Sequence, residues 1–117
     1  MFKNILRGIL DRVEGAVAIS LIGLDGIAIE SISEDGIALD VIGAELGSFI
    51  KGIRVSNTDL NTGDVLQFAL VTEKYITFLS AVTPDYFVLL ILRPDGNYGR
   101  ARFELGKAKL ALRDELG

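Results

Sequence analysis

The apolar residues of the first thirteen positions recur three and four residues apart, as they do on one face of an α-helix. The set is Phe2, Ile5, Leu6, Ile9, Leu10 and Val13. A helix anchored on a membrane surface would show the same period. The opposite side mixes Lys3, Arg7 and Asp11 instead of carrying a basic run, so we expect this helix to pack on a protein core.

From Gly15 the hydrophobic period becomes two. In residues 15–23 (GAVAISLIG) the large residues Val17, Ile19 and Leu21 alternate with small ones. This predicts a strand covered on both faces, with helices packed closely on the small-residue face. Asp25-Gly26 predicts a tight turn, and residues 27–33 predict the returning strand.

A second helix is predicted from Asp35 or Gly36 to Val55, ended by residues 56–58 and followed by a loop over 59–64. Its wide apolar face consists of Ala38, Leu39, Ile42, Leu46, Phe49, Ile50 and Ile53. This helix also contains Gly43, Gly47 and Gly52, and each interior glycine costs about 1 kcal/mol relative to alanine.

Three strands are predicted next, over residues 65–71, 75–82 and 86–92. The first lies at an edge of the sheet, and the last is apolar on both faces, as a strand in mid-sheet would be. Asn97 is a suitable N-cap for a closing helix over 98–116, whose Tyr98, Ala101, Leu105, Ala108 and Leu112 share a face. The order αββαβββα over residues 1–117 predicts a single α+β domain.

Composition narrows the chemistry. The 117 residues include no cysteine and no histidine, which excludes thiol catalysis, Ser-His-Asp catalysis and Cys/His zinc sites. A net charge of −4 argues against nucleic-acid binding, and no apolar run is long enough to cross a bilayer. We therefore expect a cytoplasmic, non-enzymatic protein without cofactor, metal or membrane insertion.

Two motifs resemble known sites, and both are rejected. Residues 43–52 (GAELGSFIKG) resemble a glycine-rich phosphate loop but lack its Lys-hydroxyl pair and lie within a helical pattern. A group of carboxylates could suggest a metal or an acid–base pair, but its spacing matches no calcium loop, and acids at a helix N-terminus explain it. The group is Glu30, Glu34, Asp35, Asp40 and Glu45.

What remains is a surface on the second helix. One stripe of the helical wheel holds Gly36, Asp40, Gly43, Gly47, Lys51 and Arg54, edged by Leu39 and Ile50. Small residues four apart admit a second backbone, and the polarised charges would pair Asp40 with Lys51 of an antiparallel mate. The alternative is that the two central glycines let the helix pack closely on its own sheet. A second candidate contact is the 65–71 strand, with Leu66 and Phe68, since an unpaired apolar edge can pair with another copy.

The whole chain resembles the roadblock/dynein light chain family, and specifically its MglB-like bacterial and archaeal members. The resemblance rests on the entry Val13–Ala16, the Asp25-Gly26 hairpin and the start of the last helix. That start contains Asn97, Gly99, Ala101, Arg102 and Leu105.

The resemblance implies a profilin-like fold, a five-stranded antiparallel sheet with the second helix on one face and the other two helices on the opposite face. It also implies a homodimer in which the second helices lie side by side and the third strands join. Family members are platforms for small Ras-like GTPases, and MglB-type dimers stimulate GTP hydrolysis without inserting an arginine finger.

The leading hypothesis is therefore a homodimeric module that binds and regulates a small Ras-like GTPase, with a role as its activating protein left open. The dimer and partner contacts would involve Leu39, Asp40, Gly43, Gly47, Ile50, Lys51, Arg54, Leu66 and Phe68. A scaffold light chain without GTPase regulation is a second hypothesis. A small-ligand sensor is a third, disfavoured because the strands lack converging polar residues.

Overall fold

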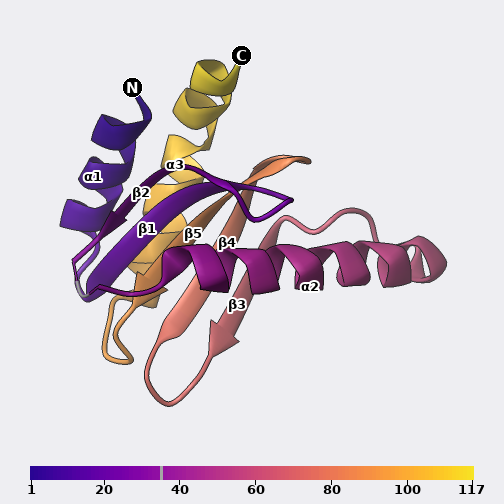
Figure 1. Cartoon of the computed structure of the whole chain (residues 1–117), viewed down its shortest axis with the longest axis horizontal. Coiled ribbons are helices and arrows are strands. Elements are labelled where there is room, and N and C mark those ends of the chain that lie inside the picture. The colour runs from indigo at the N-terminus through magenta and orange to yellow at the C-terminus, as the bar shows by residue number, and fades with distance from the viewer. Residues whose placement is uncertain (35) are drawn as a thin grey trace.

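The computed structural model describes residues 1–34 and 36–117, and contains three helices and five strands in the predicted order (Figure 1). Asp35, the earliest predicted start of the second helix, lies outside the described residues. The elements are α1 (Phe2–Arg12), β1 (Ala16–Gly23), β2 (Ala28–Ser33), α2 (Leu39–Leu60), β3 (Gln67–Val71), β4 (Ile76–Thr83), β5 (Tyr86–Leu92) and α3 (Tyr98–Leu116).

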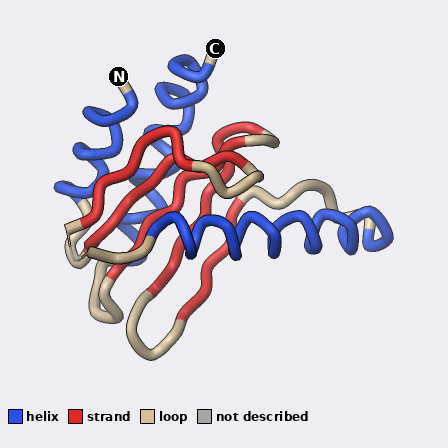
Figure 2. Tube along the Cα trace, in the orientation of Figure 1, coloured by secondary structure: helices blue, strands red, loops and turns tan. Residues whose placement is uncertain are grey.

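The strands form one antiparallel sheet in the order β2-β1-β5-β4-β3. Helices α1 and α3 lie side by side on one face, and α2 crosses the other (Figures 1 and 2). The predicted α+β class and helix placement are confirmed. So are the central place of β5, buried on both faces from Phe87 to Leu92, and the edge position of β3.

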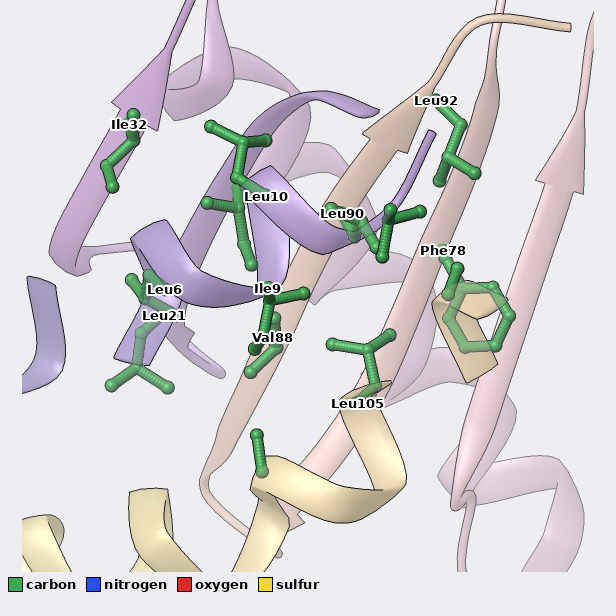
Figure 3. Close-up of a cluster of buried hydrophobic side chains, with 14 of the residues drawn as sticks. Leu6, Ile9, Leu10, Leu21, Ile32, Phe78, Val88, Leu90, Leu92 and Leu105 are labelled. Atoms are coloured by element: carbon green, nitrogen blue, oxygen red, sulfur yellow. The ribbon is translucent and has the colours of Figure 1, made fainter. Parts of the chain in front are cut away.

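The α1/α3 face holds the larger of two cores (Figure 3). Here α1 contributes Leu6, Ile9 and Leu10, which meet Leu90 of β5 and Leu105 of α3. The predicted N-cap is also confirmed, since the backbone N–H of Arg100 donates to Asn97 Oδ1 at 3.0 Å.

One side-chain assignment on β1 was wrong. Val17 packs in the second core under α2, together with Ala18 and Ile22, instead of pointing the same way as Ile19. The pairing of β1 with β5 shifts register between Ala16 and Ala18, and an extra residue in a strand reverses the alternation on one side of it.

Helix α2 begins and ends later than the sequence predicted. Gly36 has φ +64 and precedes the helix, so it cannot share a helical stripe. The predicted stop at residues 56–58 is wrong because the hydroxyls of Ser56 and Thr58 donate to carbonyls four residues earlier, which satisfies them within the helix. Asn61, with φ 56, ends the helix in the left-handed conformation.

The docking of α2 on the β1–β2 hairpin depends on glycines from both partners. A Cβ on Gly47 would lie 2.8 Å from the carbonyl oxygen of Leu24, and a Cβ on Gly26 would lie 2.6 Å from Cα of Ala44. A Cβ on Gly43 would meet Ile22 and the Gly26 carbonyl at ordinary contact distances. The helix and the hairpin therefore approach backbone to backbone.

A buried carboxylate joins α1 to α3. Glu104 has no exposed surface, and it accepts hydrogen bonds from Arg12 Nε at 2.7 Å and Arg100 Nε at 2.9 Å. The bond from Arg12 lowers the pKa of Glu104 below its ordinary value, against the opposing effect of burial, and both positive charges act in the same direction.

Replacing Gly47 with alanine should destabilise the chain by about 1–3 kcal/mol, because the added methyl meets a backbone carbonyl that cannot move without shifting the hairpin. Gly52→Ala is the matched control. It lies in the same helix facing open space, and should stabilise by about 0.5–1 kcal/mol. Urea unfolding of the two variants measures the difference, and equal stabilities would contradict the close contact.

Glu104→Gln should cost about 2 kcal/mol at neutral pH, because two arginines lose their ionised acceptor. Since the folded pKa is lowered, the carboxylate's contribution is fully present above the ordinary value of 4.5 and is lost as the pH falls through the folded pKa. The difference in the free energy of unfolding between wild type and variant, measured with urea, should become smaller below pH 4.5. Glu14→Gln, at an exposed position, should show no such gap.

Candidate functional site

The side of α2 turned away from the sheet is exposed and rich in small residues. Val41, Ala44, Ser48, Gly52 and Val55 recur at spacings of three and four, and all five are exposed. The exposed carboxylate Glu45 stands among them, and Ala44, at the margin of the stripe, is the residue that Gly26 of the hairpin approaches. Val41 and Val55 expose 58% and 72% of their surface. We call these five residues the outer α2 face.

A second exposed apolar region lies where α2 crosses the sheet edge. The ring of Phe49, 53% exposed, packs on that of Phe68 of β3 with centroids 5.1 Å apart. Leu70 of the same strand is half-exposed, and Leu66, just before the strand, is 64% exposed. We call Phe49, Leu66, Phe68 and Leu70 the edge patch. Beyond it the C-terminal half of α2 extends past the sheet (Figure 1).

Four residues of the predicted interface are not at the surface. Gly43 and Gly47 are buried against the chain's own hairpin, and Leu39 and Ile50 belong to the core under α2. The prediction that the glycines form the centre of a two-fold contact is wrong in its placement, because the space beside them is filled by Leu24 and Gly26. The alternative, close packing on the chain's own sheet, explains them.

The other predicted residues are at least partly accessible. Asp40, Lys51 and Leu66 are exposed, whereas Phe68 is half-buried under Phe49. Asp40 and Lys51 border the outer α2 face, so they remain candidates for partner contacts.

Arg54 has a structural role within its own chain. Its Nε donates to Asp64 Oδ1 at 2.9 Å, and its guanidinium stands over the ring of Phe87 at 5.5 Å. It therefore ties α2 to the segment that leads into β3. Its Nη2 is buried and has no hydrogen-bond acceptor among the described residues. Arg54 also lines a cleft of about 420 Å³ with Asn57, Thr58, Asn61, Gly63 and Asp64.

Sequence reasoning missed the outer α2 face. A signal was present, because Gly52 lies nearly opposite Gly43 and Gly47 on the wheel and the predicted stripe does not explain it. Ala44, Ser48 and Gly52 also recur every four residues, as Gly43 and Gly47 do. The predicted stripe did not include this second repeat of small residues.

Within residues 1–34 and 36–117, no three His, Cys, Asp or Glu side chains gather closely enough to hold a metal ion. None of the helices described is both long and apolar enough to cross a membrane.

Comparison with solved structures indicates the family. MglC from Myxococcus xanthus is 32% identical, with 97% of this chain and 98% of that chain covered and a TM-score of 0.69. A Roadblock/LC7 domain from Streptomyces avermitilis is 17% identical, covering 96% and 94%, with a TM-score of 0.86. MglB from Myxococcus xanthus is 13% identical, covering 98% and 96%, with a TM-score of 0.85.

The chain matches no family model and no curated protein. The two structures of lower identity show the fold, and the third combines the same fold with substantial identity over nearly the full length of both chains. These matches confirm the resemblance found in the sequence: the chain belongs to the roadblock/LC7 family, alongside MglB and MglC.

Proposed function

We propose that this protein is a cytoplasmic homodimer that binds and regulates a small Ras-like GTPase. The observation that carries the proposal is the exposed outer α2 face, a stripe of small residues with an exposed valine at each end and open space at Gly52. Aligned exposed apolar residues on a small domain are typical of a contact surface for another protein.

The edge patch supports the dimer. Strand β3 has one neighbour in the described sheet, β4, and an apolar strand with a free side either pairs with another chain or risks aggregation. Pairing of two β3 strands about a two-fold axis would join the sheets, and each overhanging α2 would then cover the edge patch of the other copy. A relative, MglB, has been solved in a tetrameric arrangement, so association of copies occurs in this fold.

In such a dimer both outer α2 faces lie on the same side of the joined sheet. Asp40 and Lys51 border each face, which offers a GTPase charged groups beside a shallow apolar surface. The small side chains of Ala44, Ser48 and Gly52 would let a partner backbone approach closely. The link to a GTPase comes from the family resemblance, and the exposed outer α2 face supports it.

The dimer can be tested at the edge patch. Leu66→Arg together with Leu70→Arg should convert a dimer into a species near the chain mass of 12.6 kDa, because two like charges would face each other across the axis. Light scattering after size exclusion measures the mass. Leu110→Arg makes the same kind of change at an exposed site on α3 and should leave the dimer intact. A wild type that is monomeric at all concentrations would rule the dimer out.

GTPase binding can be tested at the outer α2 face. Ser48→Arg should weaken binding about tenfold or more, because a long charged side chain would fill the centre of the contact. The probes are purified Ras-like GTPases of the source organism, loaded with GDP or a non-hydrolysable GTP analogue, in biolayer interferometry. Lys107→Glu, on the opposite side of the sheet, is the control and should bind as wild type.

Hydrolysis then separates regulation from scaffolding. Faster phosphate release from the GTP-loaded partner supports an activating role, and binding without that increase supports a scaffold instead. If none of the GTPases binds in either nucleotide state, the proposed partner class is wrong.

A further inference from the structure

Positive charge is concentrated on α3 in an otherwise acidic chain. Of the 12 basic residues in the sequence, five lie in α3, which also holds three of the 16 acidic residues. Two of these acids, Asp114 and Glu115, lie in the last turn of the helix, and the third, Glu104, is buried and bound to two arginines, so no acidic side chain is exposed between positions 98 and 113. The exposed surface of this stretch is therefore basic, although the net charge of the chain is −4.

Three of the five basic residues share one side of the helix. Arg102, Lys109 and Arg113 are separated by seven and four residues, which places them along a single stripe. The stripe borders the α3 residues that pack on the sheet, such as Ala101 and Leu105.

The basic stripe faces the open edge of the sheet. Tyr98, in the first turn of α3, packs on Phe78 of β4 with ring centroids 5.2 Å apart, so the helix starts above β4. Farther along, Lys109 and Arg113 line a cleft of about 320 Å³ with Val65 and Leu66, which precede β3. Helix α3 thus runs along β4 with this side turned toward β3.

The neighbouring strand is bare on this face. Ala69 and Val71 of β3 pair with Phe78 and Ile76 of β4, whose side chains point into the α1/α3 core, so they lie on the same face of the sheet. Both β3 residues are exposed, because α3 covers β4 and β5 and stops short of the edge. The basic stripe of α3 and the exposed side of β3, which carries Gln67 as well as Ala69 and Val71, thus flank the cleft that Lys109 and Arg113 line, and we call this region the groove.

We propose that this groove, opposite the outer α2 face, binds an acidic segment of a partner protein. Charge complementarity selects an acidic occupant, and the cleft selects a narrow chain over a flat surface. A bilayer would meet the protruding Phe103 and Leu110 of α3 before it reached Lys109 and Arg113 in the cleft. The one acidic residue that lines the cleft, Asp64, is already bound to Arg54.

The groove also gains from the dimer, and this step rests on the proposed function. If two β3 strands pair, the exposed β3 sides of the two copies form one continuous surface across the two-fold axis. The α3 helix of each copy then borders one end of that surface. The dimer would then hold a partner GTPase on the α2 side and an acidic tether on the other, without competition between the two.

The test uses a fluorescein-labelled peptide of alternating Glu and Leu, with a Gln-for-Glu peptide as the uncharged control, in fluorescence anisotropy. Wild type should bind the acidic peptide, and binding should weaken as salt is added. Lys109→Glu with Arg113→Glu should reduce affinity about tenfold or more, because both attractive charges become repulsive. Lys3→Glu with Arg93→Glu makes the same change in net charge away from the groove and should bind nearly as wild type.

Three results would overturn the groove: equal binding by both double variants, equal binding of both peptides, or binding to phosphatidylglycerol-containing vesicles without binding to the acidic peptide. Light scattering on the same samples tests the proposed dimer independently of peptide binding. A dimeric wild type that fails to bind the peptide contradicts the groove alone. A monomeric wild type that binds it supports the single groove and contradicts the proposed dimer.

Discussion

The close approach of α2 to the β1–β2 hairpin determines what the rest of this molecule can present. At Gly47 the helix lies so near the carbonyl of Leu24 that a single methyl group would not fit. Likewise, a methyl group on Gly26 of the hairpin would collide with the backbone of Ala44 in the helix. A contact between two backbones leaves little freedom for the helix to rotate, because any turn of α2 would bring a side chain into that space. Contacts within the chain therefore fix the rotation of α2 about its axis. The same contacts determine which five residues form the outer α2 face.

The two faces of the sheet are built on different principles. On one, α1 and α3 are locked to each other through Glu104 and share a continuous apolar core, which leaves an outer surface formed by two helices. On the other, a single helix crosses five strands and cannot cover them all, so Phe49 and Phe68 remain half-exposed at the edge. Apolar surface is therefore left exposed at this sheet edge, and it supports the proposal that a second copy packs there.

Strong, local sequence patterns led to correct predictions. Residues 86–92 are apolar without interruption and form the central strand, and Asn97 caps α3 through the hydrogen bond that its side chain favours. The helical wheel of α2 placed its residues at correct angles to one another, but a wheel does not show which side of a helix faces the sheet. Contact with the hairpin shows that Gly43 and Gly47 point inward. Two other errors have equally specific causes. The register shift near Val17 turns its side chain to the opposite face of the sheet. The hydroxyls of Ser56 and Thr58 donate to helix carbonyls, so α2 continues beyond its predicted end.

The inward position of Gly43 and Gly47 also bears on the proposal that the outer α2 face is a contact surface. Gly43 and Gly47 need no partner to explain them, since packing within the chain uses the space that they leave. Gly52 differs from them, because it costs helix stability and nothing in the described part of the chain lies within 4 Å of the position where its side chain would be. Gly106 of α3 is equally open, so the argument for Gly52 depends on the residues aligned with it. A single exposed valine is ordinary on any protein surface, but Val41 and Val55 stand at the two ends of the stripe that contains Gly52. Features that contribute nothing inside the fold and that line up on one surface support the proposal that another protein binds the outer α2 face.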